Sequence, residues 1–235
     1  MPRRFLLLAV VALPLSFLTS CSSSLFSKGP NVLSDSEARR IAGTPAYARK
    51  LAQMPFHPEP ASASVRAHAS RADKDRHGMP VYSTSERTRY VRTTAYTHTE
   101  SDHLEYGVKN AAGTNLRFNH RVRSAAADWS VYPVGTVFRV KGLPYLYVVD
   151  DYGSALAGTG TVDMFMPDPL WMKAWGSRNV ELSVVRWGSF DRSAELLSKR
   201  TSYSHCRQMY AAILRQRPNL AMAGSHRPQS VNDQG

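Results

Sequence analysis

The sequence contains very little cysteine. Cys21 and Cys206 are the only two cysteines among 235 residues, which excludes a disulfide-rich scaffold. The fold must therefore be stabilised by packing of apolar side chains, which make up 43% of the chain. Cys206 lies in a stretch with helical spacing and has no activating residue near it in the sequence. We therefore interpret it as a small buried apolar residue and not as a nucleophile.

An apolar run long enough to span a membrane comfortably is missing even at the N-terminus. Residues 1–20 begin with Arg3 and Arg4 and continue into an apolar run that Pro14 interrupts. This pattern indicates an export signal. The segment LTSC, which ends at Cys21, resembles the lipobox of bacterial lipoproteins, in which the signal is cut before the cysteine and the thiol receives a diacylglycerol.

The lipobox resemblance implies that residues 1–20 are a signal peptide and that Cys21 is the lipidated first residue of the mature protein. The protein would then be held to a membrane of the cell envelope through this lipid, and Ser22 is compatible with sorting to an outer membrane. An uncleaved anchor or an ordinary secretory signal remains the alternative, because the small residues before Cys21 fit either peptidase. If Cys21 is acylated, no intramolecular disulfide can form.

Acidic residues are scarce. The chain has 18 Asp and Glu against 30 Lys and Arg, which gives a formal net charge of +12 and favours an anionic neighbour. An exported protein seldom meets nucleic acid, and the sequence has no basic helix with interleaved aromatic residues, so we exclude nucleic acid as the partner. Muramyl peptides with free carboxylates and anionic lipid head groups fit the compartment. The alternative is that the arginines only keep the flanking segments soluble.

The chain divides into a central domain and two flanks. Residues 21–87 are rich in Ser, Ala, Pro and Arg, which predicts a tether, with two short helices expected between residues 34 and 54. Residues 88–190 form the predicted domain. A helical segment at 191–218 and a disordered tail at 219–235 follow it.

The central domain is predicted to be a mainly β structure. Short β-branched and aromatic runs are separated by Gly, Pro and Asn, and we expect strands at 90–97, 122–129, 136–141, 145–151, 161–166 and 179–187. One helix should interrupt them, with Asp168 as its N-cap, Pro169 as its first residue and Gly176 as its end. So many short strands favour a small closed barrel, because closure leaves no exposed edge.

The last segment shows a helical apolar stripe. The residues on this side are Tyr203, Cys206, Tyr210, Ile213 and Leu214. We expect a helix that packs on the barrel and ends at Pro218. An interfacial membrane helix is the alternative, since its polar face is basic.

Three aspartates interrupt or end apolar runs: Asp128, Asp151 and Asp163. Burying a carboxylate in such surroundings costs free energy, so we expect these residues to have a function. Asp151 and Asp163 end up on successive predicted strands, which we expect to pair, so that the two carboxylates converge in a groove. Paired carboxylates in partly apolar surroundings push their pKa values apart and leave one able to act as a general acid, as glycosidic bond cleavage requires. The alternative is that strand-end aspartates only cap turns by accepting backbone N–H groups.

Seven short elements follow one another between about residues 92 and 188. They are TAYT at 94–97, AGT at 112–114, ADW at 127–129, PVGT at 133–136, DYGSALAG at 151–158, VDMF at 162–165 and AWG at 174–176. In this order and spacing the segment is similar to the 3D domain, a small double-psi β-barrel named for three aspartates. This domain occurs in the membrane-bound lytic transglycosylase A family and in resuscitation-factor-like wall proteins.

The resemblance implies a lytic transglycosylase that acts on peptidoglycan glycan strands without a metal or cofactor. Asp163 matches the family's general acid and base, and Asp151 matches its partner, which stabilises the oxocarbenium-like state. The implied substrate-binding residues are Thr94, Tyr96, Asp128, Tyr152 and Gly153, with Asp128 in a structural or positioning role. A module of the same fold that binds glycan without cutting it is the alternative, and a hydrolase that uses water is a third.

The sequence departs from the usual pattern of the 3D domain at several residues. Tyr152, Ser154 and Ala157 stand where the family usually has Thr, Gly and Lys, and the loss of the lysine predicts one sugar contact fewer. The resemblance covers the barrel alone, and we expect no counterpart in this sequence of the large second domain that forms the groove in the full transglycosylase. Asp150 should point to the opposite face of its strand from Asp151 and be solvated.

Two further residue groups carry weaker expectations. His98, Glu100, Asp102 and His103 resemble a metal site in composition, but their spacing matches no known motif and favours a solvated loop. In a barrel this small, most of the four tryptophans are expected to be core residues rather than sugar-stacking surfaces.

Overall fold

The structure is a computed structural model that describes residues 57–100 and 105–220. The predicted signal, the lipidation site at Cys21 and the two expected helices between residues 34 and 54 lie outside this part, as does most of the predicted tail. Within the described residues, no helix is both long enough and apolar enough to cross a membrane.

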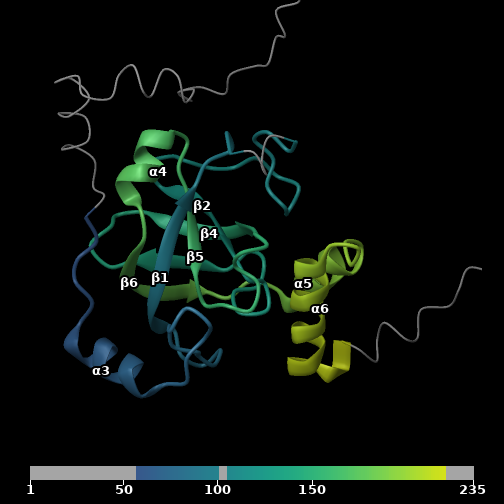
Figure 1. Ribbon diagram of the computed structural model, residues 1–235, viewed down its shortest axis with the longest axis horizontal. Coiled ribbons are helices and arrows are strands. Elements are labelled where there is room, and N and C mark those ends of the chain that lie inside the picture. The colour runs from purple at the N-terminus through teal and green to yellow at the C-terminus, as the bar shows by residue number, and fades with distance from the viewer. Residues whose placement is uncertain (1–56, 101–104, 221–235) are drawn as a thin grey trace, which may run out of the picture.

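Six strands form the centre of the molecule. They are β1 (Thr88–Tyr96), β2 (Val122–Ala127), β3 (Val137–Val140), β4 (Leu146–Asp151), β5 (Val162–Phe165) and β6 (Arg178–Arg186). Each overlaps one of the predicted strands. They close into a barrel in the order β1-β5-β2-β4-β3-β6, with β6 pairing back to β1 (Figure 1). The predicted small, mainly β barrel is confirmed.

The strand order differs from chain order around β2. This strand lies between β4, to which it is parallel, and β5, to which it is antiparallel. The expectation that the strands of Asp151 and Asp163 pair directly is therefore wrong. The connection between β4 and β5 spans about ten residues and reaches easily across two inter-strand spacings of roughly 4.8 Å each, so its length does not require the two strands to be neighbours.

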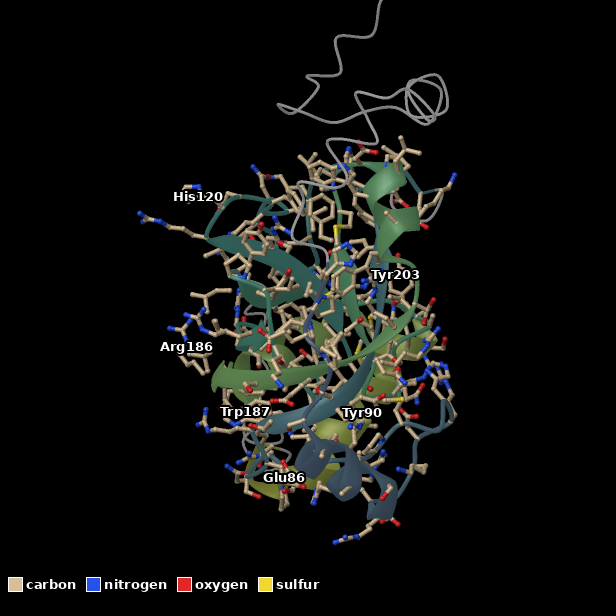
Figure 2. All side chains as sticks on the ribbon, turned by 90° about the vertical axis from the view of Figure 1, so that its left-hand side faces the viewer. Glu86, Tyr90, His120, Arg186, Trp187 and Tyr203 are labelled. Atoms are coloured by element: carbon tan, nitrogen blue, oxygen red, sulfur yellow. The ribbon has the colours of Figure 1, made fainter. Side chains whose placement is uncertain are left out.

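The barrel core is built by alternation along the strands. Val91, Ala125, Val149 and Met164 point inward and are almost fully buried. Trp129 and Trp175 are also fully buried core residues, whereas Trp171 and Trp187 are half-buried against the core. In Figure 2, Tyr90, Trp187 and Glu86 lie toward one end of the barrel and His120 toward the other.

Helix α4 (Pro169–Trp175) covers one end of the barrel (Figure 1). The Asp168 side chain accepts a hydrogen bond of 2.7 Å from Leu170 N, Pro169 is the first helical residue, and Gly176 ends the helix with a φ of 60°. This start and this end are the ones that the sequence predicts, because both depend on local backbone chemistry.

The segment 57–87 contacts the barrel, although its composition favours a tether. It contains α3 (Ala63–Arg71), and Glu59 N donates to Lys141 O at 3.0 Å. Farther along, Asp75 Oδ2 accepts a hydrogen bond from Gly160 N at 2.9 Å. Its buried apolar residues, Ala61, Ala69 and Met79, are separated in the sequence, so a search for apolar runs does not detect the segment.

Two helices pack on one side of the barrel (Figure 1): α5 (Phe190–Ser198) and α6 (Ser204–Gln216). Cys206, Met209 and Ile213 of α6 are fully buried in the same core as the barrel residues. Cys206 is thus a buried apolar residue, as predicted. Since this apolar side packs on protein, it is not available for the alternative of an interfacial membrane helix. Tyr203 precedes the helix and is exposed, contrary to expectation.

Candidate active site

A row of four residues crosses four neighbouring strands on the outer face of the barrel. Thr94 of β1 pairs with Asp163 of β5, Asp163 pairs with Ala126 of β2, and Ala126 pairs with Asp151 of β4. The residues that alternate with them point into the core. The two aspartates therefore share one face, two strand spacings or roughly 10 Å apart at the α-carbons, with only the methyl group of Ala126 between them.

Asp163 has the properties of a general acid. Its carboxyl group is half-buried, and Thr94 Oγ1 donates a hydrogen bond of 2.7 Å to Oδ1. Burial raises the pKa of Asp163 to about 6; the hydrogen bond from Thr94 opposes this rise, and the negative charges of Glu100 and Asp151 add to it. A carboxyl group with this pKa is protonated often enough near neutral pH to deliver a proton.

Asp151 is buried and surrounded by donors. Its Oδ2 accepts a hydrogen bond from the Tyr96 hydroxyl at 3.1 Å, and its Oδ1 accepts from Ala111 N and Tyr152 N, both at 3.0 Å. Three donors aimed at one carboxylate stabilise its negative charge. These three hydrogen bonds hold the Asp151 carboxyl group in one orientation on the face that it shares with Asp163.

Asp150 is a third acidic residue of this face, and the sequence analysis misplaced it. The register between β2 and β4 shifts so that Ala125 pairs with Val149 and Ala126 with Asp151, which leaves Asp150 as the extra residue of a β-bulge. Instead of being solvated, Asp150 is 5% exposed and accepts a hydrogen bond of 2.8 Å from Ser124 Oγ. Because a bulge changes the alternation, Asp150 lies on the same outer face as Asp151.

The Asp150 carboxyl group is only partly satisfied. Its Oδ1 is buried and has no hydrogen-bond partner among the described residues. Burial raises the pKa of Asp150 to about 7; the hydrogen bond from Ser124 opposes the rise, and the charge of Asp151 adds to it. The only sequence signal for this residue is the doubled aspartate at the end of an apolar strand, which does not reveal a bulge.

Tyr96 lies at the centre of the three carboxyl groups. Burial raises the pKa of its hydroxyl well above the ordinary value, and the charges of Asp151, Asp150 and Asp163 add to that rise. The ring belongs to a small apolar cluster with Ala126, Leu156 and Phe165 beside the row. This cluster provides the apolar surroundings that make charge costly on the face.

Asp128 lies elsewhere and is fully engaged in local contacts. Its Oδ1 accepts from Ser130 N and Ser130 Oγ, both at 2.6 Å, and its Oδ2 accepts from Gly158 N at 2.5 Å. It is 1% exposed and holds the turn after β2 against the loop that precedes β5. The structure thus gives it a position-holding role and does not bring it to the row.

Tyr152 joins the barrel to the C-terminal helices. Its ring packs edge-on against Trp129 at 5.0 Å between centroids, and its hydroxyl accepts a hydrogen bond from Arg200 Nη1 at 3.2 Å. Burial raises the pKa of Tyr152 to about 12, and its hydrogen bond with the Cys206 thiol adds to this. Ala157 is 1% exposed and lies in the core, so its side chain does not face the surface of the row.

A cleft of about 380 Å³ opens beside Asp151. Tyr152, Gly153 and Ser154 line one side of it, and residues from the segments 106–111 and 200–205 line the others. Of the residues that the resemblance assigns to substrate binding, Tyr152 and Gly153 are therefore at a cleft, whereas Thr94 and Tyr96 hydrogen bond to the two aspartates.

The His98 to His103 segment is only partly described. Glu100 accepts a hydrogen bond from Thr97 N at 3.0 Å, and Asp102 and His103 lie outside the described residues. Among residues 57–100 and 105–220, no group of three or more His, Cys, Asp or Glu side chains is arranged to hold a metal ion.

Comparison with protein families identifies one domain. Residues 123–186 match the model of the 3D domain, so the chain contains this domain. The match includes Asp128, Asp151 and Asp163, and it begins after Thr94 and Tyr96 of β1. No curated protein matches the chain significantly.

Proposed function

We propose that this protein is a lytic transglycosylase that cleaves the bond between N-acetylmuramate and N-acetylglucosamine in peptidoglycan. The observation that carries the proposal is the row from Thr94 to Asp151, in which a half-buried Asp163 with a pKa raised to about 6 lies two strands from a buried, donor-stabilised Asp151. The presence of a 3D domain supports it, since that family includes wall-cleaving enzymes.

The proposed reaction uses Asp163 twice. Protonated Asp163 gives its proton to the glycosidic oxygen as the bond to the muramate anomeric carbon breaks, and positive charge develops on that carbon. The resulting carboxylate takes the proton of the muramate 6-hydroxyl, whose oxygen attacks the anomeric carbon. The products are a 1,6-anhydromuramate and a free 4-hydroxyl on the leaving sugar, and no water is consumed.

Thr94 and Asp151 of the row, and the neighbouring Tyr96, support this reaction. Thr94 Oγ1 fixes the orientation of Asp163 through its 2.7 Å hydrogen bond. The negative charge of Asp151 stabilises the oxocarbenium-like state and disfavours charge on Asp163 in the resting enzyme. Tyr96 holds Asp151 in place at 3.1 Å.

Hydrolysis is the second candidate, because one observation favours it. Two strand spacings between Asp163 and Asp151 leave room for a water molecule, as in glycosidases whose carboxyl groups are roughly 6.5 to 9.5 Å apart. Hydrolysis leaves reducing ends on the glycan, whereas the proposed reaction leaves anhydro ends.

The test is mass spectrometry of purified sacculi after digestion by wild-type protein and by Asp163→Asn. We expect anhydromuramate ends from the wild type and at least about a hundredfold fewer from the variant, whose fold is checked by circular dichroism. Reducing ends in their place would establish hydrolysis. Binding to sacculi without any new ends would identify a non-cleaving module of the same fold.

We also propose that a lipid on Cys21 holds the protein to a membrane of the cell envelope, which the lipobox-like LTSC segment supports. In cells supplied with a clickable fatty acid, wild-type protein should carry the label and Cys21→Ala should not. Equal labelling of both would contradict lipidation at this residue.

A further inference from the structure

The cleft beside Asp151 is built partly by segments of the chain that the 3D domain match does not cover. Its lining residues from outside the match are Tyr106, Lys109, Asn110, Ala111, Arg200, Tyr203 and His205. In Figure 1 the segment that contains residues 105–118 and the connection between α5 and α6 lie on the same side of the barrel. The C-terminal helices therefore supply a wall that the barrel itself lacks.

The two walls are fastened to each other and to Asp151. Arg200 Nη1 donates a hydrogen bond to Ala111 O at 2.8 Å. The same Nη1 donates to the hydroxyl of Tyr152, the residue that follows Asp151 in the chain. The N–H of Ala111 in turn donates to Asp151 Oδ1 at 3.0 Å. The position of the cleft is thus coupled by direct hydrogen bonds to one of the two aspartates of the row.

The mouth of the cleft exposes aromatic surface. Tyr106 and Tyr203 are 50% and 53% exposed, and both line the cleft. They are two of the five large apolar residues that are exposed in the described part of the chain. Exposed aromatic surface at a cleft is typical of binding sites.

Two cationic side chains line the cleft. Lys109 is exposed and forms no ion pair among the described residues, and Arg200 adds a second cation. Asp151 is the only acidic residue in the lining, and its carboxylate is already the acceptor of three hydrogen bonds. Burial lowers the pKa of His205, so its ring acts as a neutral hydrogen-bonding group at neutral pH.

We propose that this cleft is a subsite for the peptide stem of a muramyl residue, with Lys109 pairing a stem carboxylate and the Tyr106–Tyr203 pair packing on the adjoining sugar. The inference rests on the proposed function, because a peptide stem can enter this cleft only if a muramate of the glycan is bound next to Asp151. A volume of about 380 Å³ is at the small end of ligand sites, which suits one or two units of a stem and not a second glycan strand.

The test measures binding in the Asp163→Asn background, so that no probe is cleaved. Isothermal titration calorimetry compares soluble glycan oligomers that carry their stems with the same oligomers after an amidase has removed the stems. We expect the stem-bearing probe to bind about tenfold more tightly. Lys109→Gln should reduce that preference by about threefold, and less at high salt, as for an exposed ion pair.

Two further variants complete the design. Tyr203→Ala removes the exposed aromatic wall and should weaken binding of both probes by about tenfold. Lys173→Gln makes the same charge change as Lys109→Gln at an exposed position on α4, away from the cleft, and should leave both affinities unchanged. Thermal unfolding shows whether each variant keeps the wild-type fold.

The outcomes separate this inference from the proposed function. Equal affinity for the two probes, or loss of the preference in Lys173→Gln as much as in Lys109→Gln, overturns the subsite. If wild-type protein produces anhydro ends while the stem makes no difference to binding, the function stands and the subsite falls. If the Lys109-dependent preference appears but the wild type forms no new ends, the subsite stands and the proposed reaction falls.

Discussion

Two regions of this small barrel bury aspartates, and they do so differently. Asp128 accepts three hydrogen bonds within 2.6 Å, all from the turn and loop that it holds together. On the outer face across β1, β5, β2 and β4, Asp150 has a buried oxygen without a partner among the described residues, and Asp163 receives one described hydrogen bond. The carboxyl oxygens of Asp128 are therefore used for structural hydrogen bonds, whereas Asp150 and Asp163 have fewer hydrogen-bond donors around their carboxyl groups.

The comparison teaches that a raised pKa alone does not mark a reacting group. Burial raises the pKa of Asp128 as well as those of Asp150 and Asp163. What differs is the number of donors around each carboxyl group and the acidic neighbours. Asp128 lies among N–H and O–H donors, whereas Asp163 lies near Asp151 and Glu100, which disfavour its charged form.

The largest expected effect is on cleavage, through Asp151→Asn. In the proposed reaction the charge of Asp151 stabilises the oxocarbenium-like state, so its removal should lower the rate of formation of anhydro ends by about 100-fold or more. Chromatography of digested sacculi measures the rate. A rate within threefold of wild type would show that Asp151 is structural like Asp128, and the contrast between the two regions would disappear.

For Asp128→Ala we expect a loss of stability and little change in the cleavage rate. Loss of its carboxylate leaves the buried N–H group of Ser130 and the partly buried N–H group of Gly158 without their acceptor, which should lower the free energy of unfolding by about 2 kcal/mol. Urea unfolding measures this loss. The cleavage rate per folded molecule should stay close to that of wild type, and a large drop in that rate would contradict a purely structural role.

Asp150→Asn should make the protein more stable at alkaline pH. The pKa of Asp150 is about 7 in the folded protein, above the unfolded value of roughly 3.9, so the native state binds more protons between these limits and stability falls as pH rises through them. Asparagine does not ionise, so the stability of the variant does not fall with pH for this reason. We expect it to gain on the order of 2 kcal/mol at pH 8 and nothing near pH 4. Urea unfolding at both pH values is the measurement, and a variant less stable than wild type at pH 8 would contradict the assignment.

The smallest expected effect is a shift in the pH profile of Thr94→Val. The hydrogen bond from Thr94 favours the charged form of Asp163, so its loss should raise the pKa of that carboxyl group. Because the general acid must be protonated, the alkaline limb of the cleavage–pH profile should move upward by about 0.5 to 1 pH unit. Thr93→Val, on the inward face of the same strand, is the matched control and should leave the limb in place.

Much of the barrel could be predicted because its signals are local. The six strands follow from β-branched runs between turn residues, and the ends of α4 follow from Asp168, Pro169 and Gly176. The strand order could not be predicted in this way, because the insertion of β2 between β4 and β5 depends on contacts between distant segments.

The candidate site was predictable only in part. Asp151 and Asp163 stand out in the sequence as carboxylates in apolar runs, and their placement on one face follows from alternation once the register is known. Asp150 was missed because a bulge overrides alternation. The cleft wall from Arg200 and Tyr203 was missed because it requires the packing of α5 and α6 on the barrel, which no motif records.

The most direct test of this account is the titration of Asp163 itself. In protein labelled with ¹³C at aspartate carboxyl groups, the resonance that disappears in Asp163→Asn should titrate with a midpoint of about 6. A midpoint at or below about 4, the ordinary value for aspartate, would mean that Asp163 is ionised at neutral pH and has no proton to give.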